Sequence, residues 1–207
     1  MTITNEDNMQ LMARYEDNHF DLAIVDPPYG INASEMTMGS GKNKKYKKGK
    51  KWDNETPNLE YFKELQRITK NQIIWGGNYF ADKLKPSRCY IFWDKGINGD
   101  CDFADGELAW CSFNKVLRIA PIRYKGFLGA DNVRIHPTQK PVKLYEWLLM
   151  NYAKEGDKIL DTHLGSGSIA IACHNLGYDL TACELDKEYF DEAIKRINQH
   201  KAQLRII

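Results

Sequence analysis

A carboxylate, two prolines and an aromatic ring stand together near the start of the chain, in the order Asp26-Pro27-Pro28-Tyr29. They follow the apolar run 22–25, which predicts a strand that delivers them to its carboxyl end. Two consecutive prolines cannot continue a central strand, but their carbonyl oxygens stay free to accept hydrogen bonds. The segment therefore offers hydrogen-bond acceptors beside a stacking surface, although these four residues alone also fit an ordinary turn with a capping aspartate.

A second group of residues that could bind a ligand lies near the end of the chain. A strand predicted over 158–161 runs into a turn and a helix, and the polar and glycine residues of this turn are Asp161, Gly165, Ser166, Gly167 and Ser168. Glycines here let the backbone turn sharply and approach a ligand, and Glu184, after the next strand, is placed to accept hydrogen bonds from ribose hydroxyls. The turn is not G-x-G-x-x-G and holds no basic residue for a pyrophosphate. It favours a nucleoside without phosphates, with a purely structural turn as the alternative.

Between these two groups lies a polar loop bounded by prolines, His136-Pro137-Thr138-Gln139-Lys140-Pro141. Its four polar side chains, His136, Thr138, Gln139 and Lys140, could contact the amino-acid end of a ligand. The loop equally fits a rigid entry into the helix that follows, because proline suits the first turn of a helix.

Positive charge is concentrated in one segment. The chain has a net charge of +1, but seven lysines fall within residues 42–51. Tyr46 lies inside this run and Trp52 follows it, and basic residues interleaved with aromatic ones suit a nucleic-acid strand. The loop over about 35–52 is thus a candidate DNA-contacting segment, and a solvated surface loop is the alternative. Its candidate DNA-binding residues are Lys44, Lys45, Lys47, Lys48, Lys50 and Lys51. The segment 121–134, which contains Arg123, Lys125 and Arg134, is a second candidate.

The elements that must position these residues alternate along the chain. Apolar runs predict strands over about 21–26, 72–75, 89–94, 114–120, 158–161 and 178–183. Helical spacing predicts helices over about 59–68, 142–152, 166–176 and 189–197, with a helical turn at about 105–110. Repeated βα units predict one α/β domain over 1–207, with a doubly wound, mostly parallel sheet and sites at the carboxyl ends of its strands.

Composition excludes several classes of protein. The sequence is 43% hydrophobic and 28% charged, with no apolar run long enough to span a membrane. The N-terminus lacks the basic start and apolar core of a signal peptide, which predicts a cytoplasmic location. The five cysteines are scattered and form no C-x-x-C pair, which argues against a disulfide framework or a zinc site.

Taken together, the three motifs resemble those of the S-adenosylmethionine-dependent amino-methyltransferases that modify adenine N6 or cytosine N4 in DNA. Because Asp26-Pro27-Pro28-Tyr29 precedes the glycine turn, the order is similar to the permuted β subgroup, whose Rossmann-like fold has a seven-stranded, mostly parallel sheet. The resemblance implies S-adenosylmethionine as cofactor, DNA as partner and a base flipped out of the duplex. It also assigns the segments 75–80 and 91–95 to the half of the sheet that binds substrate.

The resemblance further implies roles for individual residues. Asp26 and the carbonyl of Pro27 would accept the two hydrogens of the target amino group, and Tyr29 would stack on the base. In the cofactor pocket, Glu184 would bind the ribose, and the glycine turn 165–168 would line the methionine and sugar portions. His136, Thr138 and Lys140 would lie near the amino-acid end.

One position departs from the family pattern. The family usually has Asp-Pro-Phe at the start of the glycine turn, whereas this chain has Asp161-Thr162-His163. His163 either replaces the phenylalanine by stacking or faces solvent.

The resulting prediction is a DNA adenine-N6 methyltransferase, because Asp rather than Ser opens the Pro-Pro-Tyr motif. The alternatives are a cytosine-N4 methyltransferase and a non-catalytic relative that binds DNA or cofactor. An RNA or protein methyltransferase ranks last, since those enzymes commonly carry Asn at the position of Asp26. The sequence does not determine the target site, whether the chain forms a homodimer, or whether a partner restriction nuclease exists.

Overall fold

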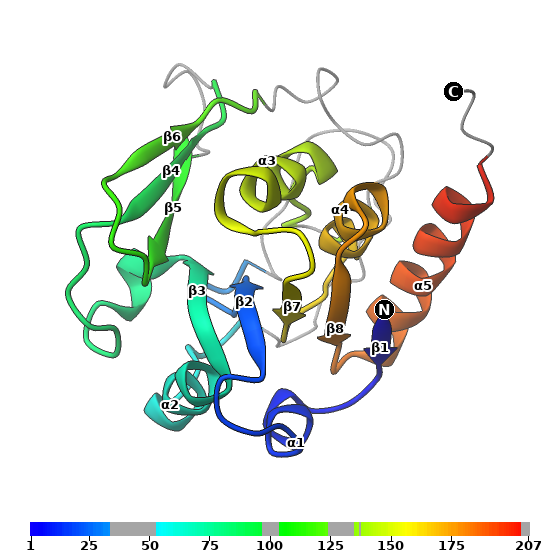
Figure 1. The fold of residues 1–207 in the computed structure, drawn as a ribbon, viewed down its shortest axis with the longest axis horizontal. Helices are drawn as coiled ribbons and strands as arrows, with labels where there is room; N and C mark the ends of the chain where they lie inside the picture. The colour runs from blue at the N-terminus through cyan, green and yellow to red at the C-terminus, as the bar shows by residue number, and fades with distance from the viewer. Residues whose placement is uncertain (34–52, 97–103, 124–134, 137, 204–207) are drawn as a thin grey trace.

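In the computed structural model, the strands of the described residues, 1–33, 53–96, 104–123, 135–136 and 138–203, form one eight-stranded sheet (Figure 1). The first four strands are β1 (Thr2–Thr4), β2 (Phe20–Val25), β3 (Thr69–Trp75) and β4 (Tyr90–Asp94). The last four are β5 (Gly106–Cys111), β6 (Arg118–Ala120), β7 (Lys158–Asp161) and β8 (Asp179–Cys183). The predicted DNA-contacting segment 35–52 lies outside the described residues, as does most of 121–134.

Helices connect most of these strands. The α-helices are α1 (Asn8–Met12), α2 (Leu59–Ile68), α3 (Val142–Tyr152), α4 (Ser168–Leu176) and α5 (Lys187–Ala202), and a 3₁₀ helix, η1, covers Gly77–Phe80. Side chains cap several of them: the Asn58 side-chain carbonyl accepts from the backbone of α2, and the Asp186 carboxylate does the same for α5. Across the described residues, no helix has the length and apolar character that a membrane crossing needs.

The strand order is β1-β8-β7-β2-β3-β5-β4-β6, and β5 runs antiparallel to both of its neighbours. The other pairings are parallel. From β2 the chain proceeds to β3 on one side, whereas from β7 it proceeds to β8 on the other. The topological switch point therefore lies between β2 and β7, and a crevice at their carboxyl ends is where such sheets bind ligands.

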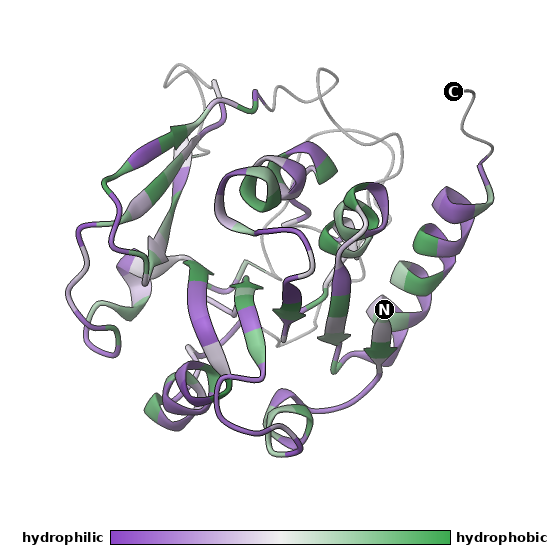
Figure 2. Ribbon diagram, viewed as in Figure 1, coloured by the Kyte–Doolittle hydropathy of each residue, from purple (hydrophilic) through white to green (hydrophobic). Residues whose placement is uncertain are grey.

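Alternate residues of the central strands pack into two separate cores. Leu22 and Ile24 of β2 face a core that includes Leu144 of α3 and Ile169 of α4. On the other side of the sheet, Ala23 and Val25 join a second core, to which α1 and α2 contribute. In Figure 2, hydrophobic and hydrophilic stretches alternate along the ribbon of α5, as expected of a helix with one buried face. The predicted doubly wound, mostly parallel fold is thus confirmed.

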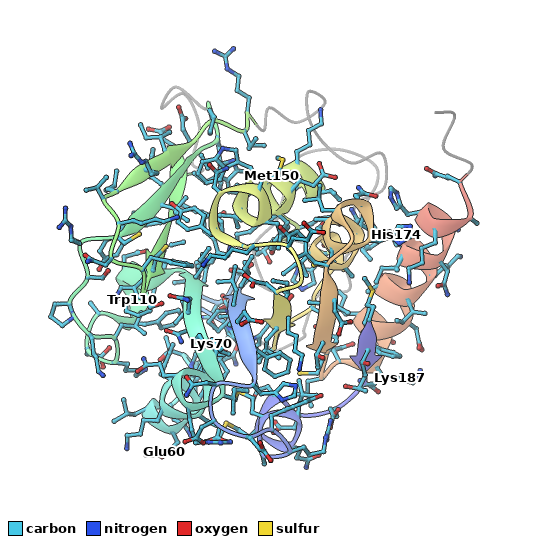
Figure 3. All side chains as sticks on the ribbon, in the orientation of Figure 1. Glu60, Lys70, Trp110, Met150, His174 and Lys187 are labelled. Carbon is cyan, nitrogen blue, oxygen red and sulfur yellow. The ribbon has the colours of Figure 1, made fainter. Side chains whose placement is uncertain are left out.

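Two labelled side chains illustrate the division of the molecule into these two cores. Trp110, labelled on β5 in Figure 3, is 4% exposed and packs in the core on the α2 side. Met150 on α3, labelled in the same figure, is 64% exposed on the other side of the molecule from that core.

The structure differs from the prediction at two elements. The prediction of a helical turn over 105–110 is wrong, because this part of the chain forms the strand β5, which pairs with β3 and β4. Leu108 and Ala109 favour helix by propensity, but backbone pairing on both sides outweighs that preference. The sheet of the described residues also has eight strands where seven were expected, and the short edge strand β1 was not predicted.

Candidate active site

Two cavities open at the carboxyl ends of the strands, beside the switch point. The first, about 490 Å³, lies over β7 and β8 and is lined by residues that include His136, Glu184 and Leu185. The second, about 510 Å³, lies over β3 and β5 and is lined by residues that include Tyr79 and Glu107. After the roles that the sequence resemblance implies for their residues, we call them the donor cavity and the base cavity. Four residues line both cavities, at the place where the two adjoin, and we call this place the wall: Asp26, Pro28, Thr138 and Lys140.

Asp26 follows the last residue of β2, so the strand itself delivers its carboxylate to this wall. Both carboxylate oxygens have a partner. Oδ1 accepts a hydrogen bond from the Tyr29 hydroxyl at 2.6 Å, and Oδ2 accepts one from Lys140 Nζ at 2.6 Å. The loop 136–141 was expected either to contact a ligand's amino-acid end or to form a rigid helix entry. Its Lys140 also supplies the cation that holds Asp26.

Lys140 belongs to a chain of alternating charges. Its ammonium group is also 2.9 Å from Glu107 Oε2, and Glu107 Oε1 is 2.7 Å from Lys95 Nζ. Lys140 is 3% exposed, and a buried charge needs such partners to offset the loss of water. The four side chains from Asp26 to Lys95 thus form a neutral network that runs from the wall along the base cavity.

Burial and charge act against each other in this network. Burial raises the pKa of the Asp26 carboxyl, and Lys140 opposes that rise. Burial alone would also raise the pKa of Glu107, but Lys140 and Lys95 lower it to about 2. The pKa of Lys140 is raised, because Asp26 and Glu107 outweigh the effect of its burial. Lys140 is therefore a cation, and Glu107 an anion, at neutral pH.

The ring of Tyr29 lines the base cavity and is stacked on Tyr79, with ring centres 4.9 Å apart and planes at 13°. It also packs over Gly76, where an added Cβ would come within 2.3 Å of the ring. Gly76 has φ +71°, a conformation that favours glycine in its own right. Only glycine therefore fits at the point where β3 ends, and Tyr79 extends the aromatic surface to solvent with 42% exposure.

In the donor cavity, Glu184 follows β8 and is held by backbone donors. Its Oε2 accepts from Gly165 N at 2.9 Å, and its Oε1 accepts from Asp186 N at 2.9 Å. These bonds fix the carboxylate at the cavity, while lone pairs remain for further donors. Burial raises the pKa of Glu184, and the backbone hydrogen bonds oppose the rise.

His163 lines the donor cavity and is engaged on both ring nitrogens. Nε2 lies 3.1 Å from Asn8 Nδ2, and Nδ1 lies 2.9 Å from Thr162 Oγ1. The ring meets that of Tyr61 edge-on, with centres 5.4 Å apart. Burial lowers the pKa of His163 to about 3, so the ring is neutral at physiological pH. Of the two expectations for His163, the structure favours a packed aromatic ring over a solvent-facing one.

The structure does not place every predicted cofactor residue in the cavity lining. His136, Thr138, Gln139, Lys140, Gly165, Ser166 and Glu184 line the donor cavity. Asp161, Gly167 and Ser168 are not among its lining residues. Ser168 Oγ accepts from Arg196 at 3.0 Å, and an added Cβ on Gly167 would lie 2.9 Å from Ile197. These two therefore fit the turn against α5, and Asp161, 2% exposed, accepts from His163 N at 2.9 Å.

Other residues at the site were not singled out from the sequence. Glu107 lies in the element predicted as helix, so its partnership with Lys140 had no visible signal. Asn8 and Tyr61 reach the donor cavity from α1 and α2. Asp53 lies at the base cavity, directly after the lysine-rich segment, and no sequence motif marks it. Lys95 falls in a segment that the resemblance had assigned to the substrate half, and it lines the base cavity.

Comparison with known proteins places these features in context. Residues 110–195 match the model of a DNA methylase family. In sequence, the chain is similar to the type II methyltransferase M.HpaI of Haemophilus parainfluenzae, with 37% identity over 67 residues. That match covers 32% of this chain and 21% of the relative, so it spans about a fifth of the relative's length.

Solved structures extend the likeness to nearly the whole chain. A structure of M1.HpyAVI in complex with SAM aligns with a TM-score of 0.61 and 20% identity, covering 95% of this chain and 98% of that one. The PvuII DNA methyltransferase, described as cytosine-N4-specific, aligns with a TM-score of 0.59 and 12% identity over 99% of this chain and 87% of that one. At such identities the structures show the fold. The match to the DNA methylase family confirms the resemblance that the motifs predicted over residues 110–195, and the solved structures show the same fold over nearly all of the chain.

Proposed function

We propose that this protein transfers a methyl group from S-adenosylmethionine to the N6 amino group of an adenine in DNA. The observation that carries the proposal is the wall shared by the two cavities. A nucleoside-type donor in one cavity and a flipped-out base in the other would meet at Asp26-Pro27-Pro28. The base has to leave the duplex, because an amino group inside the helix cannot reach such a wall.

The donor cavity suits S-adenosylmethionine in size and chemistry. Its volume of about 490 Å³ lies within the range of small-ligand pockets. The fixed carboxylate of Glu184 matches a pair of ribose hydroxyls. Leu185 beside it is 71% exposed, and a purine ring would cover this apolar side chain. The loop residues His136 and Thr138, which also line this cavity, would hold the amino-acid portion.

S-adenosylmethionine, when bound, supplies an already activated methyl group on a sulfonium. The task left to the protein is to prepare the acceptor nitrogen, whose lone pair is delocalised into the ring. Asp26 and the Pro27 carbonyl would accept its two hydrogens, which favours a pyramidal nitrogen and stabilises the positive charge that develops there. An ionised carboxylate has about four acceptor positions, so Asp26 can accept this hydrogen bond while it keeps Tyr29 and Lys140.

The base cavity supports the other half of the proposal. Tyr29 and Tyr79 offer a stacking surface, and base-aromatic stacking contributes about 1–3 kcal/mol per base. Adenine is preferred over cytosine because Asp stands before Pro-Pro-Tyr. Cytosine N4 is the second candidate, since the fold is shared with a cytosine-N4-specific enzyme.

The test is incubation with methyl-labelled S-adenosylmethionine and unmethylated DNA, followed by digestion and mass spectrometry of the nucleosides. N6-methyldeoxyadenosine supports the proposal. If N4-methyldeoxycytidine is the sole product, the target base is cytosine and not adenine. If the protein binds both ligands but no DNA becomes methylated, the chain is a non-catalytic relative.

Asp26→Ala is the variant that tests the mechanism. It should abolish transfer but change the Kd for S-adenosylmethionine by less than about threefold, because the donor cavity keeps its other contacts. Asp82→Ala, at an exposed position away from both cavities, is the control and should retain activity. Equal loss of cofactor binding and transfer in Asp26→Ala would contradict the assigned role.

A further inference from the structure

Asp53 is a buried carboxylate to which three backbone amides donate. It is 1% exposed, and its Oδ1 accepts from Tyr29 N at 2.6 Å and from Gly30 N at 3.0 Å. Its Oδ2 accepts from Ala33 N at 2.8 Å. Hydrogen bonds to an ionised acceptor are short and strong, and a buried carboxylate depends on them to offset its lost hydration. One side chain therefore holds three backbone positions of the turn 29–33.

This turn has a backbone that needs such support. Gly30 has φ +72° and Asn32 has φ 55°, so two of its residues lie in the left-handed region. Glycine adopts this region freely, and asparagine adopts it more readily than most other residues but at a cost in energy. Asn32 N also donates to the Asp53 carbonyl at 3.0 Å. The chain thus wraps around Asp53 directly after the Asp26-Pro27-Pro28-Tyr29 motif.

The consequence of this anchoring reaches the candidate catalytic carboxylate. With its backbone fixed by Asp53, Tyr29 directs its hydroxyl to Asp26 Oδ1 at 2.6 Å. The Tyr29 ring is also held in place by its contacts with Gly76 and Tyr79. A shift of the turn would therefore move the Tyr29 hydroxyl and release one oxygen of Asp26 from its partner.

We propose that Asp53 is a positioning residue for methyl transfer: it holds the Tyr29–Ala33 backbone so that Tyr29 keeps the Asp26 carboxylate aimed at the wall between the two cavities. The proposal rests on the proposed function. It predicts an effect on the transfer step rather than on cofactor binding, because Asp53 lines the base cavity and is not among the residues that line the donor cavity. Ala33 and Asp53 also bracket the lysine-rich segment in sequence, so this carboxylate joins the two ends of that segment.

The first variant is Asp53→Asn in the full chain, which keeps the shape of the side chain but replaces one acceptor oxygen by a donor. We expect kcat to fall about 100-fold, the loss that a displacement of about 1 Å can cause, while the Kd for S-adenosylmethionine stays within about threefold. Hydrogen–deuterium exchange should rise in the peptide that covers residues 26–33. The matched control is Asp21→Asn. Asp21 also accepts a backbone N–H, from Lys158 at 2.9 Å, but lies at the other end of β2, and this variant should retain kcat.

The second variant, Tyr29→Phe, tests the link from Asp53 to Asp26 without disturbing the anchor. It should lower kcat but leave exchange over residues 26–33 as slow as in the wild type. The inference is overturned if Asp53→Asn keeps the wild-type kcat, if its loss of kcat is matched by an equal loss of cofactor affinity, or if Tyr29→Phe is fully active. In each case the active wild type leaves the proposed function intact, whereas a wild type that methylates no DNA refutes both.

Discussion

Lys140 Nζ lies 2.6 Å from Asp26 Oδ2, although the two residues are 114 positions apart in the chain. The contact joins the loop before α3 to the end of β2 and gives the candidate catalytic carboxylate a buried counter-ion. Removing one partner of such a pair leaves the other charge buried without compensation, which typically costs about 3–5 kcal/mol.

We therefore expect Lys140→Met to reduce both stability and transfer. Burial and the nearby Glu107 raise the pKa of Asp26 while Lys140 lowers it, so loss of the ammonium group raises this pKa further. The carboxylate form that accepts hydrogen bonds would then appear only at higher pH, so the acidic limb of the activity profile should move upward. The pH dependence of kcat measures this shift, and Lys143→Met, at an exposed position three residues later, is the control. An unshifted limb would show that Lys140 does not govern the ionisation of Asp26.

Glu107→Gln should weaken the network from its other side. The pKa of Glu107 is about 2, since Lys140 and Lys95 overcome the effect of burial, so the variant removes a charge that is present at neutral pH. Lys140 would keep Asp26 as its carboxylate partner, and we expect a loss of kcat of about tenfold, smaller than for Lys140→Met. The Kd for S-adenosylmethionine should not change, because Glu107 is absent from the donor-cavity lining. Steady-state kinetics and calorimetry separate the two effects, and a change in Kd alone would contradict the assignment.

Glu184→Ala should act on the donor instead. It removes the fixed acceptor that we assign to the ribose, and it frees the Gly165 and Asp186 amides. We expect the Kd for S-adenosylmethionine to rise at least about tenfold, with a much smaller effect on kcat at saturating donor. Isothermal calorimetry measures the first quantity, and the exposed Glu155→Ala is the control. If binding is unchanged, the ribose is held elsewhere.

Asp161 predicts a pH dependence of stability. Burial raises its pKa to about 8; the His163 amide opposes this rise, and Asp26 and Glu184 add to it. The folded protein therefore holds the proton more tightly than the unfolded chain does. The stability that Asp161 contributes is complete below about pH 4 and is lost as the pH rises to about 8, at about 1.4 kcal/mol per unit of pKa difference. Urea unfolding at a series of pH values should show that the free energy of unfolding of Asp161→Asn increases relative to that of the wild type as the pH rises. A difference between the two free energies that does not change with pH would refute the assignment.

Replacing the six lysines with glutamine tests the predicted DNA-binding role of the lysine-rich segment. The residues to change are Lys44, Lys45, Lys47, Lys48, Lys50 and Lys51. DNA of any sequence should bind more weakly, and the slope of log K against log salt should flatten by about 0.9 for each phosphate that the variant no longer neutralises. Fluorescence anisotropy over a salt series measures the slope. If the slope equals that of the wild type, the lysine-rich segment is a solvated loop that does not bind DNA.

Local pattern was sufficient for much of the fold. The apolar run before Asp26 predicted β2, and the periodicity of 59–68 predicted α2 with the bounds that the structure has. It failed at β5, whose Glu107-Leu108-Ala109 favours helix locally and becomes a strand only because β3 and β4 flank it. Three-residue β1 is too short to give a periodic signal.

For the candidate site, the sequence indicated residues whose motif lies in one stretch, and it missed contacts that depend on partners from far along the chain. Asp26 and Glu184 were identified from their places after strands. The resemblance placed Lys140 near the amino-acid end of the cofactor. Its ion pairs with Asp26 and Glu107 were not predicted, because they form only in the folded protein. Asp53 carries no motif, and its importance is visible only in the three amides that point at it.

The wall of Asp26, Pro28, Thr138 and Lys140 is assembled from two parts of the chain, the end of β2 and the loop before α3. The ion pair between Lys140 and Asp26 joins these two parts. Because the four residues line both cavities, a displacement of the loop from β2 would change the shape of both at once. One buried contact thus couples the two cavities mechanically.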